Sequence, residues 1–191
     1  MTVPEMLQFI NREFEADAEP EFATNLRRFF KEDVDPYGVR GARVKQTEAA
    51  VYREIKHWSI ADRDRLCETL WKNGKLECGM LVNHLYRRFR KQCGAREFAM
   101  FELWIDRFVT NWAHTDGVAG WLMAASIEND PALIDRLYKW TNAPNRWKRR
   151  AAAVALVQEA KHGRHTEAIS RSRSCSSRMK TTWSARVSAG S

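Results

Sequence analysis

The sequence predicts an all-α fold, an α-solenoid superhelix of HEAT-like helix pairs. Apolar residues recur with a helical period along most of the chain, and no convincing strand pattern occurs. Every second expected helix begins near residue 43, 77, 112 or 146. Two helices in each unit of about 35 residues is the spacing typical of α-solenoid repeats. The prediction depends on this spacing, because no sequence motif recurs from unit to unit.

The individual helices follow from apolar periodicity and from signals at their ends. Ser59 with Asp62 resembles a capping box, Gly74 is a C-terminal stop, and Pro131 suits the first position of a helix. Residues 33–38 are predicted to turn, because their proline fixes φ and their final glycine tolerates a left-handed backbone. Helices are expected at 3–18, 20–30, 43–57, 59–73, 77–92, 96–109, 112–127, 131–140 and 146–161.

Charge and composition limit the classes of function that the protein can have. The chain has 191 residues, with 32 Lys+Arg, 24 Asp+Glu and 8 Trp. Residues 170–191 hold many of the excess cations and no acid, so the rest of the chain is only mildly basic. Its positive charge is clustered, which is the distribution that nucleic-acid binding needs.

Other residue types argue for a reduced environment and against a membrane. The four cysteines show no C-x-x-C spacing, which indicates packed thiols rather than disulfides or a zinc site. The longest charge-free apolar run, 117–127, is far shorter than the ~18 residues of a membrane span. His162 and His165 have the spacing of a ligand pair, but no third ligand lies nearby. We expect a soluble cytoplasmic monomer without a metal, cofactor or membrane partner.

The stretch 101–116 ends in the strongest candidate for chemistry. Trp112 and Asp116 are four residues apart, which places them on one face of a helix, one turn apart. Residues 147–150 join a tryptophan to three cations near a later helix start. A carboxylate and two tryptophans beside concentrated positive charge suit a polyanion with a cationic reacting centre, such as damaged DNA.

The helix starts near 43, 77, 112 and 146 are expected to line one rim, because alternate helices of a solenoid run roughly parallel. Free N–H groups and positive dipole ends at this rim favour phosphate. Phosphate contact is the favoured interpretation for residues 147–150, whereas Lys72 and Lys75 are interpreted as ordinary solvated charges. The residues expected to contact DNA are Arg40, Arg43, Lys45, Trp147, Lys148, Arg149 and Arg150.

Five stretches, in order, resemble the DNA alkylation repair enzyme family, the HEAT-like-repeat DNA glycosylases. The resemblance runs from about residue 5 to 169, and its most specific part is the paired Trp-x-x-x-Asp and Trp-x-Arg-Arg signatures. The stretches are Tyr37–Arg40, Leu70–Gly74 with Glu77, Phe101–Trp104, Asn111–Asp116 and Asn145–Arg150.

The resemblance implies removal of cationic N3- and N7-alkylated purines from duplex DNA by hydrolysis of the N-glycosidic bond. It makes Asp116 the catalytic acid and Trp112 the aromatic residue that contacts the lesion. Arg149 or Arg150 matches the arginine that contacts the DNA backbone. It also implies that the base need not be flipped into a pocket.

Physical chemistry supports these roles. A purine with a fixed positive charge is already a good leaving group, so the main need is to stabilise charge on the sugar. An ionised carboxylate does this electrostatically and can orient the attacking water. A tryptophan attracts the cationic base with about 1–2 kcal/mol when desolvated.

Two other functions and several residue assignments stay open at this level. A HEAT-like DNA-binding protein without catalysis is the first alternative, and a protein-interaction scaffold the second. We interpret His114 as a surface residue, with contact to DNA as its alternative. Apolar helical positions predict core locations for Trp58, Trp71, Trp104, Trp121 and Trp140.

Residues 1–169 are predicted to form the glycosylase domain and residues 170–191 a basic Ser/Arg-rich tail. A disordered tail is the usual interpretation. We favour the product of a frameshift, because codons read one base earlier permit apolar residues at helical spacing. The domain would then be incomplete at its C-terminus and lack a lesion-facing tryptophan that the family tends to place near position 190. Activity would be reduced or lost.

Overall fold

The structure is a computed structural model that describes residues 1–161 and 163. The part of the chain that it describes is built from helices and forms no β-strand, apart from one isolated bridge between Asp35 and Lys75. The predicted all-α class is confirmed. The tail at 170–191, and with it the frameshift prediction, lies outside the described residues.

The helices begin and end close to the predicted positions. In chain order they are α1 (Val3–Ala16), α2 (Pro20–Phe29), α3 (Gly41–Ile55), α4 (Ile60–Asn73), α5 (Leu76–Arg88), η1 (Arg90–Gln92), α6 (Ala95–Arg107), α7 (Trp112–Gly117), η2 (Val118–Met123), α8 (Ala124–Asn129), η3 (Pro131–Leu133), α9 (Ile134–Trp140) and α10 (Arg146–Lys161). The single helix predicted at 112–127 is present as α7 and α8, and only its interruption by a π-helical segment, η2, was not predicted.

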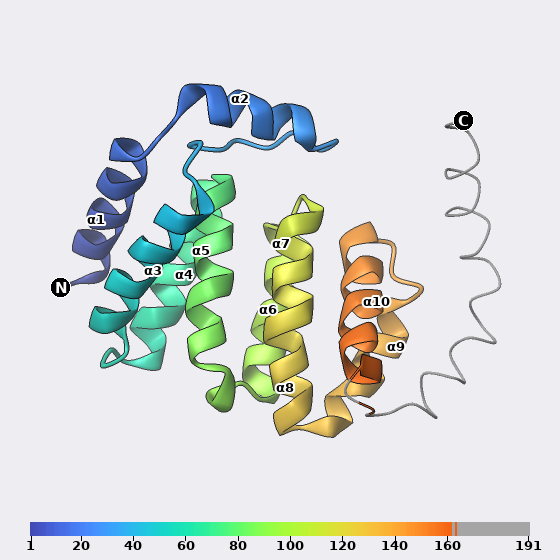
Figure 1. Ribbon diagram of the computed structural model, residues 1–191. Helices are drawn as coiled ribbons and strands as arrows, with labels where there is room; N and C mark the ends of the chain where they lie inside the picture. The colour runs from blue at the N-terminus through green and yellow to red at the C-terminus, as the bar shows by residue number, and fades with distance from the viewer. Residues whose placement is uncertain (162, 164–191) are drawn as a thin grey trace, which may run out of the picture.

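The helices stack as antiparallel neighbours, with α3, α5, α7–α8 and α10 in front of α4, α6 and α9 in Figure 1. The N-terminal ends of α3, α5, α7 and α10 all lie at one end of the stack, the top in Figure 1, and α2 crosses above those of α3, α5 and α7. The predicted rim is therefore present. Layered helix pairs of this kind are compatible with a solenoid.

A buried carboxylate holds the segment between α2 and α3 against this rim. Glu77 is 1% exposed. It accepts hydrogen bonds from the backbone N–H groups of Tyr37, Gly38 and Val39, at 2.9, 2.9 and 3.0 Å. Gly38 has φ of 89°, and a Cβ there would lie 2.4 Å from the carbonyl oxygen of Glu19. The turn predicted at 33–38 thus needs both its glycine and a partner 39 residues away.

A continuous apolar core runs from α1 to α10, and most predicted core tryptophans belong to it. Trp71, Trp104 and Trp140 are buried, and Trp58 is partly buried against the same cluster. The prediction for Trp121 was wrong, because its side chain is 36% exposed. A π-helix closes i→i+5 hydrogen bonds and so adds a residue to its turn, which changes the face that following side chains occupy.

The three described cysteines are free and buried, as predicted. Cys67, Cys78 and Cys93 make no disulfide. Burial raises the pKa of the Cys78 and Cys93 thiols to about 12, so both stay protonated and unreactive at neutral pH.

Candidate nucleic-acid interface

Trp112 stands at the first turn of α7, under the end of α2. The Asn111 side chain caps this helix by accepting a hydrogen bond from the His114 backbone N–H at 2.9 Å. The indole of Trp112 stacks on Phe30, with ring centroids 5.3 Å apart and planes 19° apart. Phe29 approaches the indole by its edge, at 5.9 Å. One face of Trp112 is therefore covered, and the side chain as a whole is partly exposed.

Asp116 lies one turn further along α7 and meets α10. Its two carboxylate oxygens accept hydrogen bonds from Nε and Nη2 of Arg150, at 2.7 and 2.8 Å. The side chains of Asp116 and Arg150 keep 34% and 43% of their surface exposed. These hydrogen bonds raise the pKa of Arg150. The structure thus joins the predicted acid to one of the two candidate arginines as a fork-like, solvent-accessible pair.

The other residues at the start of α10 are engaged within the protein. Arg149 donates to the carbonyl oxygens of Ala143 and Pro144, at 2.6 and 2.7 Å. The ammonium of Lys148 lies 2.9 Å from Glu102 and 2.7 Å from Asp106, and only 16% of this side chain is exposed.

Two further side chains close this end of α10. Trp147 is partly buried against the core, and the guanidinium of Arg146 lies over its ring at 4.2 Å. Arg146 also lies 3.2 Å from Glu32, which follows α2. The other carboxylate oxygen of Glu32 is buried and accepts no hydrogen bond among the described residues.

At the start of α3 the predicted cations differ in their partners. Arg40 forms a two-point contact with Glu19, and Arg43 lies 3.1 Å from Asp17. Within the described part of the chain, Lys45 is exposed and forms no ion pair. Lys72 and Lys75, interpreted as solvated charges, each pair with a carboxylate at 2.8 Å, from Glu68 and Asp35 respectively.

The prediction that His114 is a surface residue or touches DNA was wrong. Its side chain is 4% exposed and packs edge-on against Trp71, with ring centroids 5.0 Å apart. Its Nε2 lies 2.8 Å from the carbonyl oxygen of Leu76, which can only accept, so Nε2 carries the proton. The Asn111 amide then donates to Nδ1 at 3.0 Å. Burial lowers the pKa of His114 to about 4, and with both nitrogens engaged the neutral ring ties α7 to α5.

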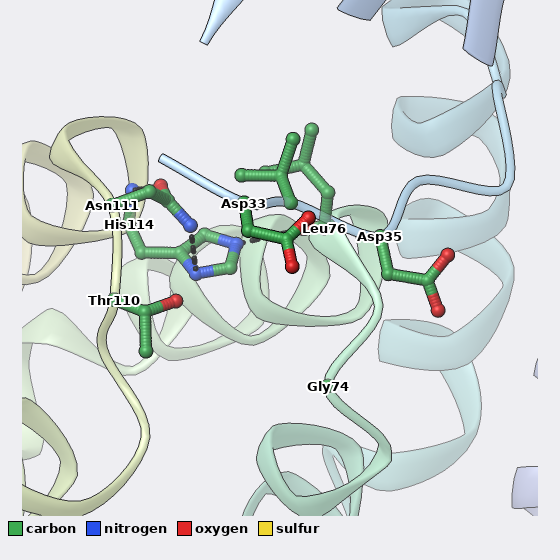
Figure 2. Close-up of a pocket in the computed structure, with 8 residues that line it drawn as sticks. Asp33, Asp35, Gly74, Leu76, Thr110, Asn111 and His114 are labelled. Carbon is green, nitrogen blue, oxygen red and sulfur yellow. Dashed lines mark hydrogen bonds between the residues drawn. The ribbon is translucent and has the colours of Figure 1, made fainter. Parts of the chain in front are cut away.

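A small acidic cavity lies beside this histidine, as Figure 2 shows. Its volume is about 120 Å³, and its wall includes Asp33, Asp35, Thr110 and Asn111. Negative charge and small size make it unsuitable for a phosphate or a nucleobase. We therefore centre the candidate interface on the exposed pair of Asp116 and Arg150.

Two residues near Trp112 were missed by the sequence analysis. Phe29 is 68% exposed although it contacts Trp112, and Glu32 is the carboxylate that reaches Arg146. An aromatic pair at the end of a helix, followed by an acid, gives a weak signal in one sequence. Their placement depends on α2 crossing over the start of α7.

The fold and this rim define an all-α protein of stacked helix pairs with a carboxylate–guanidinium pair at the joined helix starts. The chain matches the DNA alkylation repair enzyme family over residues 10–179, and it belongs to that family. No curated protein matches the chain.

The described residues offer neither a metal site nor a membrane span. They contain no group of three or more His, Cys, Asp or Glu placed to hold a metal ion. His162 and His165 lie outside the described residues. No helix within the described ranges has the length and apolarity to cross a membrane.

Proposed function

We propose that this protein is a DNA glycosylase that excises cationic N3- and N7-alkylated purines from duplex DNA by hydrolysing the N-glycosidic bond. Its family consists of DNA alkylation repair enzymes, which supports an alkylated DNA substrate. The observation that carries the reaction type is the solvent-accessible carboxylate of Asp116, beside Trp112 and bound to Arg150.

A phosphate of the DNA backbone can replace Asp116 as the hydrogen-bond acceptor of Arg150. Both side chains are more than a third exposed, so water screens the attraction between them. A backbone phosphate competes well for a guanidinium, because it offers a full negative charge and two acceptor oxygens. When Arg150 turns to phosphate, the Asp116 carboxylate is left ionised and facing the DNA.

The freed carboxylate then acts on the transition state. The alkylated purine already carries a positive charge and leaves with the electrons of the glycosidic bond. Positive charge grows on the sugar, and Asp116 stabilises it and orients the water that attacks. Trp112 holds the cationic base by cation–π contact, through the indole surface that Phe30 does not cover. No flipping of the base is needed at an open rim.

The other residues predicted to contact DNA fall into two groups, according to the contacts that they make within the protein. Arg150 and Lys45 are the cations that a phosphate reaches most easily, while Arg40 and Arg43 would have to exchange Glu19 and Asp17. Their exposed fractions, 60% and 54%, make such an exchange inexpensive. Trp147, Lys148 and Arg149 instead hold the start of α10 in place, because their polar or apolar surfaces are engaged within the protein.

One observation favours a second function, a DNA-binding protein without catalysis. The carboxylate of Asp116 already has a two-point partner, and it contributes to the reaction only if DNA displaces that partner. In this alternative, Arg150 and Asp116 simply join α7 to α10.

The test is to incubate the protein with a duplex that contains N7-methylguanine and with the same duplex unmodified. Release of free methylated base together with abasic sites is expected from the first duplex only. Tight binding of both duplexes with no released base would leave the DNA-binding alternative. Absence of both binding and release would favour the scaffold.

A further inference from the structure

The outer surface of α5 and η2 carries a second group of cations and an exposed aromatic ring, separate from the pair of Asp116 and Arg150. The guanidinium of Arg87 lies over the ring of Trp121, 4.9 Å from its centroid. His84 flanks the same indole, with ring centroids 5.1 Å apart. A guanidinium stacked on indole keeps its N–H edges free for phosphate, because the aromatic face uses only its flat side.

Positive charge predominates around this indole. Lys45, Arg87 and Arg88 all lie close enough to His84 to act on its pKa. The one carboxylate in the group, Glu48, is neutralised by Arg88, at 2.8 Å through Nε. Within the described residues neither Arg87 nor Lys45 forms an ion pair, unlike Arg40, Arg43 and Arg150. In this part of the chain no carboxylate therefore neutralises these two cations, which belong to α5 and α3, two helices of the front layer in Figure 1.

The imidazole ring of His84, which lies beside the indole, is uncharged. Burial lowers the pKa of His84, so the imidazole is neutral at pH 7 and serves as a side wall for the indole. Trp121 itself is 36% exposed beside Arg87 and His84, so part of the indole is accessible to a ligand.

Trp121 lies on the same long helix as Asp116. They are five positions apart, within about 8 Å along the helix axis. Asp116 contacts Arg150 of α10, whereas Trp121 contacts Arg87 of α5. A duplex bound at Asp116 therefore lies close to Trp121 as well.

We propose that Trp121, Arg87 and Lys45 form a second DNA contact, which binds the sugar–phosphate backbone of the duplex beside the site of Asp116. Arg87 and Lys45 each bind a phosphate, and the exposed indole packs on a deoxyribose. The inference rests on the proposed function for its choice of duplex DNA, and it adds a contact on the outer surface of α5 and η2. The contact is independent of sequence and of damage, because it involves backbone groups only.

The test measures binding of an unmodified duplex against salt concentration for the parent protein, Arg87→Gln and Trp121→Ala. Matched controls are Arg65→Gln, on α4, and Leu103→Ala, on α6, both exposed and on the layer behind. Arg87→Gln is expected to lower the slope of log K against log salt by about one unit. Trp121→Ala is expected to weaken binding roughly three- to tenfold, with the slope unchanged. The controls should match the parent in both quantities.

Trp121→Phe keeps a ring and should recover most of the lost affinity, which separates a contact from a folding defect. Parent-like binding by both Arg87→Gln and Trp121→Ala overturns this inference and leaves the proposed function intact. If the two variants bind more weakly than the parent, but the parent releases no methylated base, the contact is supported and the glycosylase activity is contradicted. If the parent does not bind the duplex, or self-associates through Trp121 in sedimentation, the surface has another occupant and the inference is wrong.

Discussion

The two sides of α7 show how one short stretch divides between structure and chemistry. On the inner side, His114 and Thr115 are buried, and each has its hydrogen-bonding groups fixed by α5 or by the helix itself. On the outer side, Trp112 and Asp116 are both partly exposed, and Asp116 pairs with the exposed Arg150. The inner side sets the position of the helix, and the outer side is left adaptable. Substitutions on the inner side should therefore cost stability, and those on the outer side should cost binding or rate.

The largest effect is expected at Gly79 of α5, which packs against His114 on the inner side. A Cβ at Gly79 would lie 2.5 Å from Nε2 of His114 and 2.5 Å from the Trp71 ring. Gly79→Val should lower the free energy of unfolding by about 3 kcal/mol or more, measured by urea denaturation. Gly41→Ala is the control, because nothing lies within 4 Å of its added Cβ. Equal loss in both variants would mean that the inner side is not specially packed.

A pH-dependent loss of stability should come from His114. Its pKa is about 4 in the folded protein and near the ordinary value of 6.5 when unfolded, so the unfolded chain binds more protons between these values. Stability from this group is full above pH 6.5 and falls as the pH is lowered towards 4, by about 3 kcal/mol in total.

His114→Gln removes this proton binding. The free energy of unfolding of the variant should change less between pH 7 and pH 4.5 than that of the parent. Parallel pH profiles would contradict a buried neutral imidazole.

On the outer side, Arg150 and Arg149 should behave differently despite being adjacent. Arg150→Ala should weaken binding to any duplex roughly tenfold at low salt and reduce the salt slope by about one unit. Arg149→Ala should change the slope less, because its guanidinium donates to two carbonyl oxygens of its own chain. Titrations of both variants at several salt concentrations make the comparison. A larger slope change in Arg149→Ala would reverse the assignment.

What the sequence could predict follows the same division between local and distant information. Helix starts near 43, 77, 112 and 146 and the cap at Ser59 were predictable, because caps and apolar periods act over a few residues. The rim was predicted from these helix starts, because they recur about every 35 residues.

Contacts between neighbouring repeats were out of reach of those local rules. Lys148 finds Glu102 and Asp106, and His114 finds the carbonyl of Leu76, across separations of roughly 40 residues that no local rule specifies. Trp121 was misplaced for a related reason, since the π-helical segment has no signal in the spacing of apolar residues.

The central claim is that Asp116 acts on the transition state rather than on binding. The most direct measurement is single-turnover release of N7-methylguanine by the parent and by Asp116→Asn, at protein concentrations that saturate the duplex. Asparagine keeps the size of the side chain and removes its charge. We predict at least tenfold slower release, with duplex affinity nearly unchanged. Equal release rates for the two proteins would contradict the account.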